Sequence, residues 1–213
     1  MKTDELITAL AAASEPVDPR APSRRMLLAS LGGAALAVPL MIGLLGLNPL
    51  LAQASRAPMF WVKLVFVAAV ATAAFRVALR LAKPGVPAQR AVVMVAVPFA
   101  AIWLLAVAAL VASAPGEGKA LILGSTWSAC PLNIGMLSAP ALVLTLGVMR
   151  SLAPIRMPLA GAAAGLLAGA LGATVYTLHC PEMAAPFVGT WYVLGMLVPA
   201  AVGAALGRLV LRW

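Results

Sequence analysis

The chain has 213 residues, of which 63% are hydrophobic and only 10% are charged, and its mean hydropathy is +1.04. Soluble domains are only about half apolar, so this composition excludes an ordinary soluble domain and indicates a membrane protein. The 15 Lys and Arg residues outnumber the six Asp and Glu residues, which gives a net charge of +9. We do not expect a nucleic-acid partner, because the basic residues lie in short stretches between apolar runs, where they orient membrane spans.

Residues 1–25 are predicted to form a separate amino-terminal segment with a short amphipathic helix and a proline-rich linker. Thr3 is expected to cap the helix, and Asp4 and Glu5 lie in its first turn, where the helix dipole favours acidic side chains. The apolar residues that share one helical face are Leu6, Ile7, Leu10 and Ala13. The stretch from Val17 to Pro22 is expected to be extended and stiffened by its prolines.

This helix is predicted to need a partner, because isolated helices of about ten residues are marginal in water. The partner is either a protein that takes up the apolar face in a groove or the lipid headgroup region. The segment has no basic amphipathic face, which weakens the headgroup alternative. A passive tail is the remaining interpretation.

Six stretches in residues 26–213 are apolar over the roughly 20 residues that a helix needs to cross a bilayer. They are Met26–Leu51, Pro58–Leu79, Ala91–Ala112, Ala129–Met149, Met157–Leu178 and Phe187–Leu209. Internal prolines are tolerated in membrane helices as kinks, and no segment shows the alternation of a membrane barrel strand. The predicted fold class is therefore all-α, a polytopic membrane bundle of six transmembrane helices.

The start of the first span has a second interpretation. Arg24 and Arg25 precede an apolar run, and Ala52–Ala54 follows it, as in a twin-arginine export signal with a small-residue cleavage site. We favour a basic flank of the first span, because five further spans follow and a folded soluble cargo is missing.

The basic residues divide unequally between the two sides of the predicted bundle. One side receives Lys2, Arg20, Arg24, Arg25, Arg76, Arg80, Lys83, Arg90, Arg150, Arg156, Arg208 and Arg212, and the other receives Arg56, Lys63 and Lys119. The positive-inside rule places the richer side, and with it both termini, in the cytoplasm. Lys63 is near a span end, so we expect its amine to extend to the interface.

Small residues recur in the fifth span, where Gly161, Gly165 and Gly169 repeat every four residues. Close packing of small residues drives the association of membrane helices. The stripe is expected to pack against the sixth span, with a dimerisation face as the alternative. No Asp, Glu or His lies near the middle of a span, which argues against ion-coupled transport.

Cys130 and Cys180 are the only cysteines, and each is followed by proline. Cys130 opens the fourth predicted span and Cys180 closes the fifth, so the topology places both at the non-cytoplasmic surface. In a bacterial inner membrane that surface faces the periplasm, where disulfides persist. Three interpretations stay open, namely redox or metal sensing, a structural disulfide, and two unrelated buried thiols.

Cys130, His179 and Cys180 are chemically able to capture a metal ion. We expect no resident cofactor, only transient binding of a heavy metal. A thioredoxin-like or quinone-linked oxidase lacks its usual CxxC pair in this sequence.

Further segments distributed along the chain combine into one pattern. They are Met1–Ile7, Cys130–Pro131 leading to Leu137–Pro140, Pro154 through Gly161–Leu166, Tyr176–Cys180, Phe187–Tyr192 and the basic end Arg212–Trp213. In this order and spacing they resemble the NrsF family of bacterial inner-membrane anti-sigma factors, over essentially the whole chain.

The resemblance implies a regulatory protein rather than an enzyme. Such a protein holds an extracytoplasmic-function sigma factor at the membrane through its cytoplasmic amino-terminal segment and keeps it from RNA polymerase. The residues that would contact the partner are Thr3, Asp4, Leu6, Ile7 and Leu10, and those that would sense metal or oxidative stress are Cys130 and Cys180. The alternatives are a membrane thiol–disulfide protein and a small transport protein. The sequence does not indicate the oligomeric state.

Overall fold

The computed structural model describes residues 3–13, 18–83, 86 and 89–212, and in these ranges the regular structure is entirely helical. Six helical stretches are long and apolar enough to cross a membrane. They are α2 (Ala21–Leu44), α4 (Pro58–Leu81), α5 (Gln89–Val111), α7 (Cys130–Ser151), α8 (Met157–Tyr176), and a continuous stretch of α9 (Ala185–Phe187), η1 (Val188–Tyr192) and α10 (Val193–Val210). The predicted all-α bundle of six spans is confirmed.

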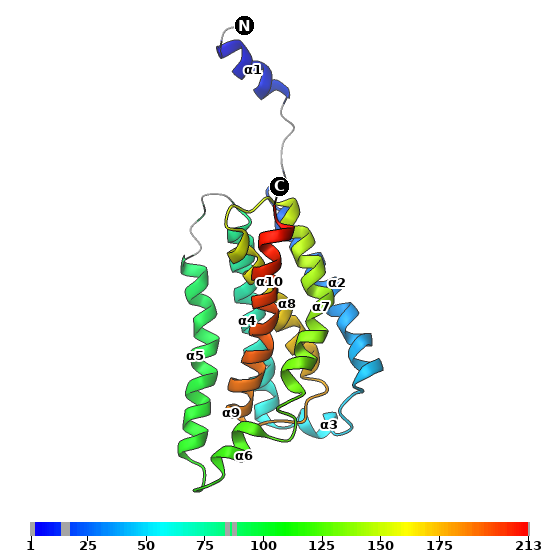
Figure 1. Ribbon diagram of the computed structural model, residues 1–213, viewed down its shortest axis with the longest axis vertical. Helices are drawn as coiled ribbons and strands as arrows, with labels where there is room; N and C mark the ends of the chain where they lie inside the picture. Colours follow the sequence, from blue (N-terminus) through cyan, green and yellow to red (C-terminus); the bar gives the residue numbers. More distant parts are fainter. Residues whose placement is uncertain (1–2, 14–17, 84–85, 87–88, 213) are drawn as a thin grey trace.

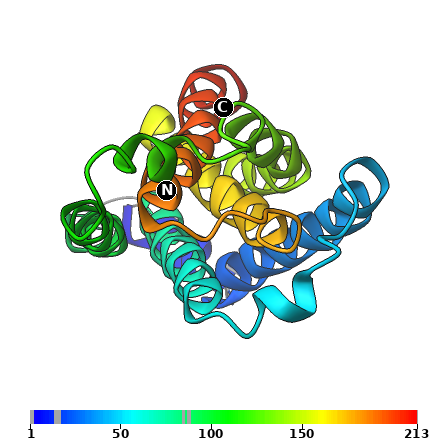
Figure 2. The same ribbon diagram turned by 90° about the horizontal axis from the view of Figure 1, so that it is seen from below.

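Helix α8 is the centre of the bundle. It packs against α10, α7, α4 and α2, whereas α5 lies at the periphery beside α4 and α9 (Figures 1 and 2). The inner face of the bundle holds two clusters of buried side chains, one around Met149 and Leu167 and the other around Ile134 and Tyr176. Small side chains allow neighbouring helices to approach a membrane helix closely. Helix α8 consists largely of Gly and Ala, which suits its central position.

The two ends of the bundle differ. Helix α1 (Thr3–Ala13) lies outside the bundle, beyond the end of the bundle where the C-terminus also lies (Figure 1). We name this end of the bundle the terminal end. The short helices α3 (Leu51–Ala54) and α6 (Gly118–Leu123) lie with α9 at the opposite end, which we name the thiol end. The short amino-terminal helix predicted from the sequence is thus present as α1.

The predicted limits of the first span were wrong at both ends. Helix α2 begins at Ala21, and Pro22 lies in its first turn, where a missing N–H costs no helical hydrogen bond. Pro22 therefore belongs to the helix and not to the extended linker. The helix ends at Leu44, because the chain turns at Gly46, whose φ of +78° suits glycine.

The glycine stripe of α8 faces α10. A side chain added at Gly161 would overlap the carbonyl group of Gly203, and one added at Gly165 would overlap the carbonyl of Pro199. At Gly169 an added Cβ would lie 2.8 Å from the carbonyl oxygen of Met196. The two backbones therefore touch along this seam, in the way that small residues permit between membrane helices.

Replacement of Gly165 by Ala is expected to destabilise the bundle by about 1–3 kcal/mol or more, because its Cβ would lie 2.8 Å from the Cα of Ala200 with only backbone to move aside. The control is Gly135→Ala, whose Cβ meets nothing within 4 Å and is expected to be neutral or stabilising by up to about 1 kcal/mol. Thermal unfolding of the detergent-solubilised chain measures both. Equal unfolding temperatures for the two variants would contradict the close backbone contact between α8 and α10.

Candidate functional site

The two cysteines meet in one buried cluster at the thiol end. Cys130 is the first residue of α7, and Cys180 lies in the strap, the name we give to residues 177–184 between α8 and α9. Both side chains are fully buried, both thiols are free, and both belong to the same group of buried residues as Tyr176 and Tyr192. The Lys63 amine hydrogen-bonds the Cys180 carbonyl oxygen and lies beside the Tyr192 ring. We call Lys63, Cys130, Tyr176, Cys180 and Tyr192 the thiol cluster.

Lys63 does not extend to the interface, so that expectation was wrong. Its side chain is 0% exposed and points into the bundle from α4. The amine donates hydrogen bonds to the carbonyl oxygens of Cys180 (3.2 Å) and Glu182 (3.0 Å) and lies 5.4 Å from the centre of the Tyr192 ring. Charged groups inside membrane proteins are costly and mark functional sites, so Lys63 is a functional candidate that sequence reasoning missed.

Tyr192 is placed by an irregularity in the last span. It ends the five-residue π-helical segment η1, and such segments are frequent at functional sites. Its ring stacks obliquely on Tyr176, with 5.8 Å between the ring centres. Its buried hydroxyl has no hydrogen-bond partner among the described residues, while Cys180 and Thr177 are its polar neighbours. A buried hydroxyl without a partner requires an explanation, because such groups are rare.

The strap is tied down across the thiol end. Figure 2, which views the molecule from this end, shows it running from α8 across the bundle to α9. The Glu182 carboxylate accepts hydrogen bonds from the Ser125 backbone N–H and hydroxyl, both 2.7 Å long. The same carboxylate lies against Gly124, whose φ of +56° and lack of a side chain allow the approach. The strap thus covers the thiols and is fastened on both sides, by Lys63 and by Ser125.

The possible metal ligands are only partly brought together. The His179 ring is half-buried, and its Nδ1 lies 2.9 Å from the carbonyl oxygen of Gly46, to which it donates. Among the described residues no group of three His, Cys, Asp or Glu side chains is placed to hold a metal ion. The structure therefore places Cys130 and Cys180 in one buried cluster, whereas His179 holds the strap to the turn after α2.

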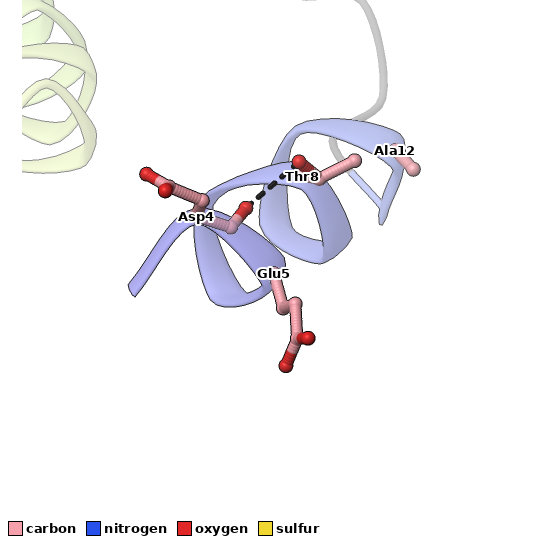
Figure 3. A pocket seen from close by; sticks show the side chains of 4 residues that line it. All are labelled: Asp4, Glu5, Thr8 and Ala12. Atoms are coloured by element: carbon pink, nitrogen blue, oxygen red, sulfur yellow. Dashed lines mark hydrogen bonds between the residues drawn. The ribbon is translucent and has the colours of Figure 1, made fainter. Parts of the chain in front are cut away.

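Helix α1 presents its predicted partner-binding residues at the other end of the molecule. Asp4, Glu5, Thr8 and Ala12 line a shallow hollow on one face, where the Thr8 hydroxyl donates to the Asp4 carbonyl oxygen (2.8 Å) (Figure 3). Ile7 lies on another face of the helix and is 60% exposed. Thr3 is also exposed, while the side chains of Leu6 and Leu10 lie outside those the structure describes.

The sequence identified the two thiols as candidate site residues but did not identify the residues around them. Tyr192 lay inside an apolar span, where an aromatic residue is more often an interfacial anchor. Lys63 was the informative residue, because it is the one lysine of the sequence that lies inside a predicted span, five residues beyond the start of that span. An intramembrane lysine is by default a functional candidate, and this criterion alone could have found it.

Fold and site together define a polytopic membrane protein with a free-standing helix at one end and buried thiols at the other. A family model described as negative regulator of sigma F (NrsF) matches residues 10–213. A probable anti-sigma-F factor NrsF from Azospira oryzae is 47% identical over 213 residues, and an anti-sigma-F factor NrsF from Caulobacter vibrioides is 40% identical over 215 residues, each over the full length of both chains. The chain belongs to the NrsF family, as the resemblance indicated, and its relatives support an anti-sigma factor role. No solved structure matches it.

Replacement of Glu182 by Ala is expected to open the strap and to raise the alkylation rate of Cys180 by N-ethylmaleimide by about tenfold or more, because hydrogen bonds to a charged acceptor contribute about 1.5–3 kcal/mol each. The matched control is Glu117→Ala, an exposed acidic residue next to α6 whose side chain caps nothing. Mass spectrometry of the alkylated peptides in native membranes measures the rates. Unchanged labelling in the Glu182 variant would show that the strap does not limit access.

Proposed function

We propose that the chain is a membrane anti-sigma factor that holds an extracytoplasmic-function sigma factor through residues 1–25 and releases it when Cys130 and Cys180 react. The supporting observation is the separation of two sites, with α1 outside the terminal end and both thiols buried at the thiol end. The protein acts in this proposal by binding and release, not by catalysis.

The orientation follows from charge. The described basic residues Arg24, Arg76, Arg150, Arg156 and Arg208 lie in or next to helix ends at the terminal end. At the thiol end the segments between the spans carry only two Lys or Arg residues among the described residues, Arg56 and Lys119. The positive-inside rule then places the terminal end in the cytoplasm of a bacterial inner membrane and the thiols at the periplasmic side. This is the arrangement that a cytoplasmic partner and a periplasmic signal require.

Helix α1 has the features of a segment that is bound in a groove. It is 11 residues long and makes no substantial packing contact with the bundle in the part of the chain that the structure describes. A helix of this length is marginal in water, so a partner that covers its apolar face would stabilise it. The acidic face of Asp4, Glu5 and Thr8 would then stay in solvent or meet basic groups of the partner (Figure 3).

The signal acts on the two thiols in this proposal. An oxidant that joins them as a disulfide, or a thiophilic metal that binds both, would pull the start of α7 and the strap together. Either event stabilises a different arrangement of α7 and α8, and a difference of about 5.5 kcal/mol would move the population from 1:99 to 99:1. The altered arrangement then weakens the grip of residues 1–25 on the sigma factor.

Replacement of Ile7 by Glu is expected to release the sigma factor from the membrane fraction without stress, because a charge on the apolar face opposes burial in a groove. The matched control is Ala12→Glu, which adds the same charge on the acidic face and is expected to retain most of the binding. Co-sedimentation of the sigma factor with membranes that contain the full chain measures both. Equal retention by the two variants would contradict binding through the apolar face.

The double variant Cys130→Ser, Cys180→Ser is expected to hold the sigma factor normally and to release none of it on treatment with hydrogen peroxide or cadmium. Each single variant is expected to be as unresponsive as the double variant, because both a disulfide and a shared metal need two thiols. Normal release by the double variant would refute thiol sensing. Half-normal release by each single variant would show that the thiols act separately.

A further inference from the structure

We propose that Trp103 on α5 is a positioning residue for the strap. Its indole N–H binds the carbonyl oxygen of Gly189, and this hydrogen bond keeps η1 in its π-helical form and the strap closed over the thiol end. The inference goes beyond the proposed function, because it gives the peripheral helix α5 a role and concerns the closure of the strap, not the binding or release of a partner.

The first step of the argument is the carbonyl group that η1 frees. The hydrogen bonds of a π-helix run five residues along the chain and those of an α-helix run four, so one carbonyl loses its usual backbone donor where η1 passes into α10. In an α-helix the Val193 N–H would donate to Gly189, but here it donates to the carbonyl of Thr190. The Gly189 carbonyl accepts from the Trp103 indole at 2.8 Å. Lipid offers no hydrogen-bond donor to such a carbonyl, so α5 supplies one.

The second step is the fit of α5 to this one place. Ile102 and Ala106 are the only buried side chains among those that the structure describes on α5. Both residues flank Gly189, because a Cβ added there would lie 3.6 Å from the Ala106 Cβ and 3.8 Å from the Ile102 carbonyl oxygen. The same Cβ would lie 3.2 Å from the Trp103 ring, so the glycine allows the ring to approach. The turn of α5 around Trp103 is thus seated on η1, at the edge of the bundle that Figure 2 shows.

The third step connects η1 to the strap. Helix α10 is held by its backbone contact with α8, so a change within η1 moves the residues that precede it. Successive residues of an α-helix are about 100° apart around the axis, so loss of the wide turn would rotate α9 by about this angle. Phe187 and Val188, both 0% exposed, would then leave the core. The strap ends where α9 begins, so the wide turn sets the position of this end of the strap.

The fourth step is the origin of the two hydrogen bonds that side chains make to carbonyls of this region. The Thr190 hydroxyl donates to the Pro186 carbonyl at 2.8 Å and moves with η1 itself. The Trp103 indole comes from another helix, which lies at the periphery of the bundle. π-Helical turns are rare and occur mostly as single turns within α-helices. Displacement of α5 alone therefore removes a stabilising bond from η1 and lets the turn change.

The test measures amide hydrogen exchange of residues 188–194 in the purified full chain in detergent. Trp103→Phe keeps an aromatic ring but removes the indole N–H, and it is expected to raise the exchange rate of these amides by about fivefold to tenfold. The matched control is Trp61→Phe, which loses an indole hydrogen bond of 2.9 Å to the carbonyl of Ser55 and is expected to leave the same amides unchanged. Unchanged exchange in the Trp103 variant would overturn the inference.

Deletion of Thr190 tests whether Trp103 acts through the wide turn. The deletion removes the extra residue, so that α9 and α10 join as one α-helix in which the backbone itself supplies the donors. In this background Trp103→Phe is expected to change the exchange rate by less than about twofold. An equal effect of Trp103→Phe in both backgrounds would show that the ring only packs against η1, and this would overturn the inference.

Two further measurements decide the matter if the deletion variant does not fold. Tyr176 and Tyr192 are the only tyrosines of the chain, so ¹⁹F NMR with 3-fluorotyrosine gives two signals, which Tyr192→Phe assigns. Trp103→Phe is expected to shift the Tyr192 signal and to raise the alkylation rate of Cys180 by about threefold or more, whereas Trp61→Phe changes neither. An unchanged signal or an unchanged alkylation rate in the Trp103 variant would overturn the link between η1 and the strap.

Discussion

The backbone contact between α8 and α10 is the constraint on which the rest of the structure depends. Glycines at 161, 165 and 169 let the two helices touch, and this closeness leaves room around α8 for α4, α7 and α2. In lipid such packing replaces the hydrophobic effect, which has little to contribute between apolar helices. Helix α8 ends at Tyr176, and the strap with Cys180 begins there.

The second constraint is the buried charge of Lys63. A lysine inside a span is costly, and here two carbonyls of the strap and the face of Tyr192 offset the cost. The strap is an irregular segment, and two of its carbonyls accept hydrogen bonds from the Lys63 amine. Lys63 therefore supplies hydrogen-bond donors to the strap, and the strap supplies acceptors to the buried amine of Lys63. The same pairing keeps both thiols covered.

Much of the fold was predictable because membrane spans leave a strong local signal. Six apolar runs, a four-residue glycine repeat and the placement of Cys130 and Cys180 at one end of the bundle all follow from length and spacing. The expectation for Lys63 was wrong because it depends on contacts between residues far apart in the sequence. The amine of Lys63 binds carbonyls more than 100 residues away, so its position near a span end suggested the interface instead. The predicted start of the first span was wrong for a local reason, because Pro22 can lie in a first helical turn as readily as in a linker.

The distance between the two sites limits how one can affect the other. Helix α8 has 20 residues, which corresponds to about 30 Å, so no side chain at the thiol end can reach residues 1–25. A ligand or bond at the thiols can shift the molecule only by as much as it favours one arrangement over the other. The seam of α8 and α10 has no side chains to compress, so these helices are expected to move as one unit. In the proposed function the change passes through α7 and α2, which pack together, because α7 begins at Cys130 and α2 begins at Ala21, within residues 1–25.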